Sequence, residues 1–303
     1  MGPTAAGKTA TVMALAEKFA VDVVSVDSAL VYRGMDIGTA KPSLDEQARV
    51  PHRLIDILEP HEVYSAGAFC RDAAEAITEI CAAGRLPILA GGTMLYFQAL
   101  QQGLAQLPSA DPELRAEIDA RAAQSGWPAV HAELAQLDPV SAERIRPNDA
   151  QRIQRAVEVC LLSGEQLSVL QEQTNPALRA DYLNIGLIPS DRSALHRRIE
   201  QRFAAMLAAG FVAEVERIAA LPGVSAASPA LRAVGYRQVL QYLNGELTLD
   251  EAVARAVIAT RQLAKRQMTW LRSWPDLHVI DGLNGDSAEC VERLVGKWLS
   301  AEH

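Results

Sequence analysis

The chain has 303 residues, of which 49% are apolar and 22% charged, and its formal net charge at pH 7 is −8. This acidity argues against unselective nucleic-acid binding, and the lack of a long uncharged apolar run or a signal-like start predicts neither a membrane span nor secretion. Four widely spaced cysteines (Cys70, Cys81, Cys160 and Cys290) fit no zinc pattern and indicate the reduced thiols of a cytoplasmic protein.

The first element is a glycine-rich turn, Gly2-Pro3-Thr4-Ala5-Ala6-Gly7-Lys8-Thr9, which fits the pattern G-x-x-x-x-G-K-S/T. Such a turn points backbone N–H groups at a phosphate chain, while Lys8 adds a positive charge and Thr9 offers a hydroxyl to Mg²⁺. The N-terminus of a helix predicted over 9–20 favours an anion at the same place. Because this loop normally follows a central buried strand, a strand is expected before residue 1.

Strands and helices alternate in the next hundred residues. A β-branched run over 21–26 ends at Asp27, a helix is predicted over 66–83, and an apolar strand over 86–90 runs into Gly91-Gly92-Thr93 before a helix over 94–100. This order is typical of an α/β fold with a parallel sheet, which binds ligands at the carboxyl ends of its strands. Asp27, Thr93 and the phosphate loop are therefore expected to lie at one edge.

The pattern changes at about residue 108. Helices are predicted over 111–124, 128–137, 149–163 and 165–172, with no strand between them. A strand over 182–188 then resumes the earlier pattern, followed by helices over 193–209, 212–220, 230–243 and 249–271, a strand over 277–280 and a helix over 287–299. The sequence therefore predicts a core made of 1–107 and 175–303, with a helical insertion over 108–174.

The role of Asp27 stays open on residues alone, because the side chain fits a general base, a magnesium partner or a cap for the turn at Ser28. The strand over 86–90 ends in Gly-Gly-Thr and carries no magnesium-supporting Asp, which weakens the motor and switch NTPase interpretations.

Other polar positions also leave two interpretations open. Gln151 and Arg155 share a helix face that is either a contact surface or simply solvated. Arg237 follows Gly235 in a predicted helix, where glycine costs about 1 kcal/mol unless a close backbone approach requires it. Trp270 and Trp274 either stack on bases or pack in the core.

One stretch is locally basic although the whole chain is acidic. Residues 252–275 contain no acidic side chain and five cations: Arg255, Arg261, Lys265, Arg266 and Arg272. Screening confines electrostatic fields to about 10 Å, so such a patch can hold a polyanion on an acidic protein.

Taken together, the motifs resemble those of bacterial tRNA dimethylallyltransferases. The matching segments are 2–9, 25–28, 32–42, 51–56, 91–93, 148–152, 234–238 and 259–267. The resemblance implies a P-loop NTPase-like parallel-sheet core with an inserted all-helical domain that closes on the tRNA anticodon stem-loop. It also implies a cytoplasmic monomer that uses Mg²⁺ and transfers a dimethylallyl group from dimethylallyl diphosphate to the N6 amine of the adenine 3′-adjacent to the anticodon. ATP is not hydrolysed in such a reaction.

The resemblance also implies residue roles. Asp27 matches the base that accepts the amine proton, Thr4 matches the residue that bonds the bridging oxygen, and Lys8, Thr9 and Arg237 match groups that stabilise the departing diphosphate, with Mg²⁺ at Thr9. The positions matching tRNA contacts are Asp27, Ser28, Ala29, Leu30, Thr93, Arg115, Gln151, Arg152, Ile153, Gln154, Arg155, Arg232, Ala233, Val234, Gly235, Tyr236, Arg237, Lys265, Arg266, Gln267, Met268, Thr269, Trp270, Leu271 and Arg272.

Three other functions compete with this one. An isopentenyltransferase of the cytokinin type acts on a free adenosine phosphate, which needs neither a helical insertion nor a basic stretch. A small-molecule P-loop kinase would turn over ATP, and a non-catalytic RNA-binding module would leave the phosphate loop unexplained.

Overall fold

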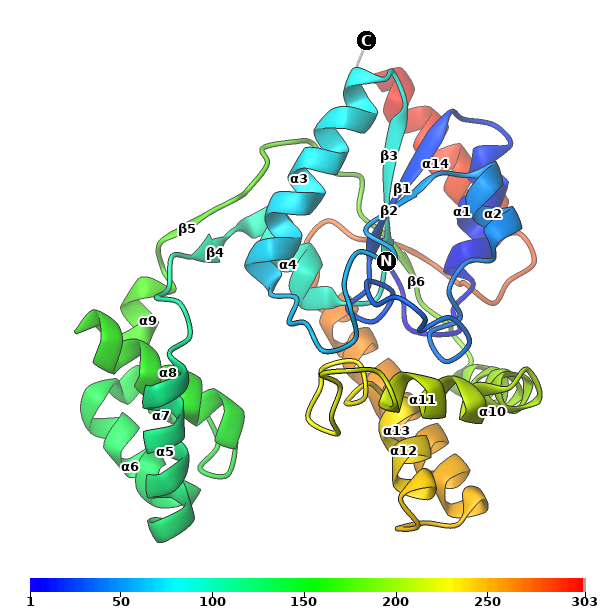
Figure 1. Ribbon diagram of the computed structural model, residues 1–303. Coiled ribbons are helices and arrows are strands. Elements are labelled where there is room, and N and C mark those ends of the chain that lie inside the picture. Colours follow the sequence, from blue (N-terminus) through cyan, green and yellow to red (C-terminus); the bar gives the residue numbers. More distant parts are fainter. Residues whose placement is uncertain (302–303) are drawn as a thin grey trace. The chain divides into compact units, whose positions relative to one another are not determined.

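The computed structural model describes residues 1–301 and divides into two compact units (Figure 1). The core unit contains residues 1–98 and the chain from 178 onward, and the helical unit is Ala99–Ala177. The helical unit extends further along the sequence, at both ends, than the predicted insertion over 108–174. Two short strands, β4 (Leu104–Ala105) and β5 (Thr174–Asn175), pair antiparallel where the chain enters and leaves it.

The core unit is built on a parallel three-stranded sheet in the order β2 (His52–Arg53), β1 (Val21–Val26), β3 (Leu86–Gly91). All six residues of β1 are buried, as expected for the middle strand of a sheet covered on both faces. Helix α1 (Lys8–Ala16) and α14 (Ser287–Ala301) lie on one side of the sheet and α3 (Ala66–Ala82) on the other (Figure 1). The predicted α/β fold is confirmed.

Four helices form a second layer below the sheet edge: α10 (Arg192–Ala208), α11 (Phe211–Ala219), α12 (Tyr236–Leu243) and α13 (Leu249–Arg272) (Figure 1). They share an apolar cluster that includes Leu195, Phe211 and Tyr236. A parallel pair, β6 (Ile185–Leu187) and β7 (His278–Ile280), precedes α10 and α14 respectively.

The start of α12 corrects a prediction. The helix begins at Tyr236 and not at 230, because Gly235 has φ +94° and ends the preceding turn. A residue with a side chain is strained at that angle, so Gly235 serves a turn and not a helix interior. Helix α2 (Leu44–Arg49) and α7 (Pro139–Arg144) were not predicted, although Ser43 and Glu46 form a capping box at α2.

The helical unit packs α5 (Pro112–Ser125), α6 (Trp127–Leu137), α7, α8 (Ala150–Ser163) and α9 (Leu167–Leu170) around Ile118, Leu134 and Ile153. Helix α9 is shorter than the predicted 165–172. The buried carboxylate of Glu158 accepts hydrogen bonds from Arg115 (2.8 and 3.0 Å) and Arg155 (2.5 Å).

The first residues of the chain lie between the ends of β3 and β6. The Met1 amine donates to the Ile185 carbonyl (2.7 Å), and the Leu187 N–H donates to the Met1 carbonyl (2.9 Å). On the other side, the Gly2 carbonyl lies 3.2 Å from the place a Cβ on Gly92 would occupy. Strands β3 and β6 are not hydrogen-bonded to each other, and β3 is only half-buried along most of its length. The strand expected before residue 1 stays a prediction.

An apolar extension of about ten residues ahead of Met1 is expected to raise the melting temperature. It would continue from Met1 along the edges of β3 and β6, and each buried Val, Ile or Leu contributes ~1.5–3 kcal/mol. It would also replace the amine of Met1, whose pKa burial lowers to about 5, by an uncharged amide. Thermal unfolding compares this variant with a Gly/Ser extension of equal length. Equal melting temperatures for both extensions would contradict the prediction.

Candidate active site

A cavity of about 960 Å³ opens in the core unit at the carboxyl ends of β1 and β3. The phosphate loop from Thr4 to Thr9, Asp27 and Thr93 all line this cavity, as predicted. Residues 28–30, 232–236 and the α13 residues Arg266, Gln267 and Trp270 complete the predicted part of its wall.

The phosphate loop presents an open helix N-terminus to the cavity. Ala5 and Gly7 have φ of 63° and 91°, and Gly7 caps α1 without any side-chain hydrogen bond. The first-turn N–H groups are therefore available to an anion. The Lys8 ammonium donates to the carbonyls of Gly2 (3.0 Å) and Pro3 (2.9 Å). Burial lowers the pKa of Lys8 to about 8, with the nearby Asp27 charge acting in the opposite direction.

Asp27 is held in a fixed orientation where β1 ends. Its Oδ1 accepts from the Ala29 N–H (2.9 Å), while no residue of 1–301 donates to its Oδ2. The Thr93 hydroxyl accepts from the Ser28 N–H (3.0 Å) and secures the same turn. Asp27 thus caps the turn with one oxygen and keeps the other for chemistry, and it is the only carboxylate among the residues that line the cavity.

Gln267 ties the cavity wall together, a role that the sequence did not reveal. Its Oε1 accepts from the Thr4 N–H (3.0 Å), and its Nε2 donates to the Gly92 carbonyl (2.8 Å). A Cβ on Gly92 would lie 2.3 Å from that Nε2, so the contact requires glycine. The oxygen and the nitrogen of the Gln267 amide both form hydrogen bonds within the protein, and the residue is only 8% exposed. We therefore assign Gln267 a role in supporting the cavity wall, in place of the predicted contact with tRNA.

Two arginines of α10 line the cavity and were missed. Arg202 donates to the Thr39 carbonyl (3.2 Å) and Arg198 to the Ala5 carbonyl (3.5 Å), from one face of the helix. Burial lowers the pKa of Arg202, and the Asp27 charge opposes this shift. The predicted cation Arg237 is exposed and does not line the cavity, because the helix that begins at Tyr236 turns its second residue to solvent.

The predicted tRNA-contacting stretch of α13 divides into two faces. Lys265, Arg266, Thr269, Trp270 and Arg272 are exposed. Met268 and Leu271 are buried in the core, which corrects their predicted contact with RNA, since a helix can present only one face to a ligand. Trp270 lines the cavity, whereas Trp274 is buried with its ring edge-on to Phe97.

The other predicted stretches divide in the same way. The side chains of Ile153 and Tyr236 are buried and Gly235 has none, although residues 235 and 236 both line the cavity. In the helical unit, Gln151 and Arg152 are exposed, whereas Arg115 and Arg155 are bound to Glu158.

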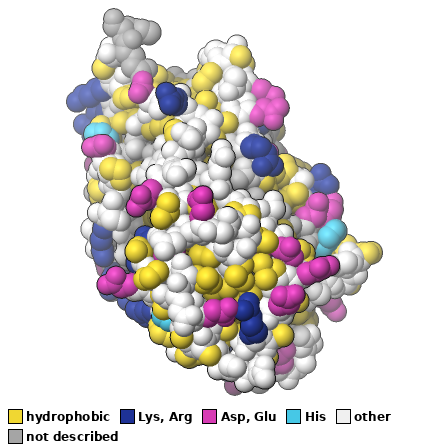
Figure 2. All heavy atoms as spheres, turned by 90° about the vertical axis from the view of Figure 1, so that its left-hand side faces the viewer, with side chains coloured by type: hydrophobic (Ala, Val, Ile, Leu, Met, Phe, Trp, Pro, Cys, Tyr) yellow, Lys and Arg dark blue, Asp and Glu magenta, His cyan; other side chains and the backbone are white. Residues whose placement is uncertain are grey.

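Charge is mixed on one face of the molecule. Figure 2 shows acidic and basic side chains interspersed over one face, with apolar side chains between them. Specific surfaces such as the exposed side of α13 must therefore supply any attraction for a polyanion. No helix within residues 1–301 is long and apolar enough to cross a membrane.

The side chains that line the cavity suit a metal ion that is held mainly by a bound substrate and water and only partly by the protein. Among the described residues no three or more His, Cys, Asp or Glu side chains gather into a metal site. The exposed Thr9 hydroxyl and the Asp27 carboxylate both line the cavity, and they are the oxygen donors that Mg²⁺ prefers. Mg²⁺ usually keeps several waters and binds substrate phosphates, so this small donor set fits it.

Residues 30–274 match the family model described as IPP transferase. The chain is 55% identical over 289 residues to the tRNA dimethylallyltransferase of Bordetella pertussis, covering 94% of this chain and 92% of the relative. It is 54% identical to the enzyme of the same name from Thiobacillus denitrificans, with coverages of 99% and 96%.

Two solved structures are similar to the chain. A tRNA isopentenylpyrophosphate transferase from Bacillus halodurans superposes with a TM-score of 0.71 at 35% identity, covering 100% of this chain and 97% of that one. A eukaryotic dimethylallyltransferase acting on tRNA superposes with a TM-score of 0.82 at 24% identity, covering 99% and 78%, and supports the fold.

Proposed function

The chain belongs to the IPP transferase family, and from that premise we propose that it transfers a dimethylallyl group from dimethylallyl diphosphate to tRNA. The acceptor is the N6 amine of the adenine 3′-adjacent to the anticodon, and diphosphate is released. The observation that carries this proposal is a cavity in which an open phosphate loop, the Asp27 carboxylate and the α10 residues Arg198 and Arg202 meet.

The phosphate loop and the cations stabilise the leaving group. As the allylic C–O bond breaks, negative charge grows on the diphosphate, and the phosphate loop, Lys8 and Arg202, which line one cavity, would stabilise that charge. Electrostatic stabilisation of this kind is usually the largest catalytic contribution. Thr4 is the donor to the bridging oxygen, and Thr9 with the diphosphate oxygens would hold Mg²⁺, which supplies further positive charge there.

Asp27 accepts the proton that the adenine amine loses as the new C–N bond forms. Oδ2 has no protein donor, whereas Oδ1 is held by the Ala29 N–H, so the base is oriented and still able to accept. General base catalysis contributes about 10²–10⁴-fold. The adenine must leave the anticodon stack to reach this carboxylate. We place the reaction in the cytoplasm, where tRNA is found, and propose that one chain suffices.

Labelled dimethylallyl diphosphate tests the proposal when it is incubated with either tRNA or AMP. We expect label in tRNA and none in AMP. Label in AMP would favour the cytokinin-type enzyme, ATP turnover a kinase, and tRNA binding without label a non-catalytic RNA-binding module.

The affinity for dimethylallyl diphosphate is expected to fall above pH 8. An anion binds the charged form of Lys8, whose pKa is about 8 in the free cavity. As pH rises past that value the ammonium is lost, and the affinity decreases by up to about tenfold per pH unit. Titration calorimetry without tRNA measures this decrease. Lys8→Arg, which stays charged, should give a flat profile, and a flat profile for the parent would exclude Lys8.

A further inference from the structure

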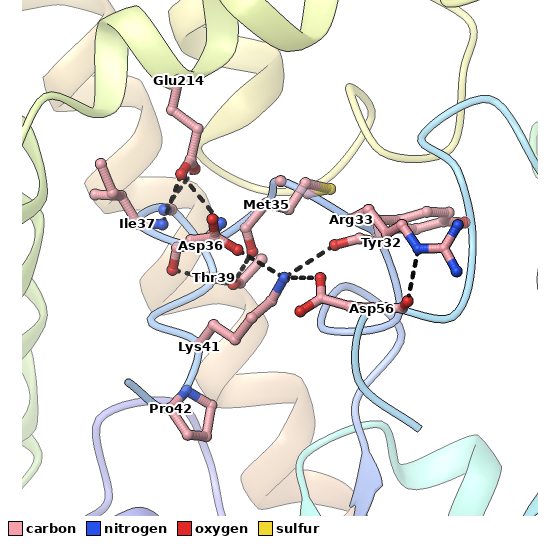
Figure 3. A network of polar contacts seen from close by, with 12 residues as sticks. Tyr32, Arg33, Met35, Asp36, Ile37, Thr39, Lys41, Pro42, Asp56 and Glu214 are labelled. Carbon is pink, nitrogen blue, oxygen red and sulfur yellow. Dashed lines mark hydrogen bonds and ion pairs between the residues drawn. The ribbon is translucent and has the colours of Figure 1, made fainter. Parts of the chain in front are cut away.

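The loop over residues 36–40 forms part of the cavity wall without being a helix or a strand. Gly38, Thr39 and Ala40 line the cavity. The backbone N–H groups of Asp36, Ile37 and Gly38 all donate to one side chain of α11 (Figure 3). The position of this wall therefore depends on the hydrogen bonds that this side chain accepts.

The side chain is Glu214, which is 1% exposed. Its Oε2 accepts from the N–H groups of Asp36 (3.0 Å) and Ile37 (2.8 Å), and its Oε1 accepts from the Gly38 N–H (3.0 Å) and the Tyr236 hydroxyl (2.6 Å). No Lys or Arg within residues 1–301 forms an ion pair with it. A buried carboxylate is costly unless hydrogen-bonded, and here four donors offset that cost.

Two further contacts leave the loop little freedom. The buried Lys41 ammonium donates to the Tyr32 carbonyl (3.0 Å) and to the carboxylates of Asp36 and Asp56 (Figure 3). A Cβ on Gly38 would come within 2.1 Å of the Phe211 ring, so the loop is pressed against α11. The loop is held on both sides, and among residues 1–301 Glu214 is the only charged group that accepts hydrogen bonds from its backbone amides.

One residue of this loop, Thr39, contacts an arginine that lines the cavity. The carbonyl of Thr39 accepts from the Arg202 guanidinium (3.2 Å), and Arg202 shares the cavity with the phosphate loop and Asp27. We propose that Glu214 is a positioning residue for the transfer reaction: it fixes residues 36–40 so that the Thr39 carbonyl holds Arg202 toward the departing diphosphate. This inference rests on the proposed function and assigns Glu214 no contact with either substrate.

Glu214→Gln tests the inference with almost no change in side-chain volume. One carboxylate oxygen becomes an NH₂ group, so at least one loop N–H faces a donor and Arg202 loses its fixed support. We expect kcat to fall roughly 10- to 100-fold, because small displacements of a catalytic group cost that much. The KM for tRNA should stay within about twofold, since Glu214 does not reach the exposed face of α13.

Two controls separate positioning from stability. Ile80→Ala removes buried packing near the end of α3, just before the chain enters β3 and so at the opposite end of that strand from the cavity, and it should lower the melting temperature without lowering kcat. In an Arg202→Ala background, Glu214→Gln should lower kcat less than about threefold, because its effect passes through Arg202. An equal loss in both backgrounds, or an equal loss of kcat in Ile80→Ala, would overturn the inference.

The same double-mutant cycle can be measured as affinity for inorganic diphosphate, without any transfer. Coupling between Glu214 and Arg202 in that assay supports the inference even if tRNA gains no label, and its absence overturns it. Failure of the proposed function would instead appear with the parent enzyme, as no label in tRNA.

Discussion

Asp27→Asn is expected to lower the single-turnover rate of dimethylallyl transfer by about 10²–10⁴-fold while leaving the fold intact. The amide oxygen of Asn can still accept from the Ala29 N–H, so the cap of the turn is kept. An amide cannot accept the amine proton, so the base is lost. Asp27→Ala removes both functions and should be equally inactive but less stable.

The pair of Asp27 variants separates the three roles that the sequence leaves open. A cap alone would leave Asp27→Asn fully active. A magnesium partner would give activity that recovers as Mg²⁺ is raised, because weaker coordination can be overcome by mass action. Rapid-quench measurement over a range of Mg²⁺ concentrations distinguishes these outcomes. Affinity for tRNA should stay within a few-fold in both variants.

Replacing Lys265, Arg266 and Arg272 together by alanine is expected to flatten the salt dependence of tRNA binding by roughly 2 to 3 units of slope. All three side chains are exposed on α13, and none forms an ion pair among the described residues. Each phosphate contact contributes a slope of about 0.7 to 0.9 between log affinity and log salt. Filter binding from low to high salt gives the slope.

Two single variants serve as controls for that experiment. Arg255→Ala removes an exposed cation from the same helix outside the predicted contact stretch and should leave the slope unchanged. Trp270→Ala should weaken binding by about 1–3 kcal/mol, if the ring stacks on a base, with little change in slope. A triple variant with the parental slope would move the tRNA elsewhere on the protein.

The parts of the fold that local chemistry determines could be predicted from the sequence. The β-branched-rich run over Val21–Val26 forms the central strand with the predicted bounds, and a helix follows the phosphate loop as its pattern requires. Arg202 could not be found in this way, because α10 carries several other cations and only its packing against the Thr39 loop selects one of them. The sequence motifs also did not separate residues that could contact a ligand from residues that hold other protein groups in place, because tertiary packing sets the orientation of each side chain. Gln267 and Tyr236 are two examples, since both side chains hydrogen-bond to other parts of the protein.

The shared carboxylate of Glu158 determines how the helical unit should be mutated. Arg115 and Arg155 together neutralise a fully buried anion, and removing either one leaves negative charge without its full complement of donors. Breaking a fully buried pair costs about 3–5 kcal/mol, so losing either of these partly exposed arginines removes up to a large fraction of the stability of such a unit. An alanine scan would therefore report both positions as essential for tRNA binding even if neither touches the RNA. Gln151 and Arg152 are exposed, so their loss of binding would reflect contact and not folding.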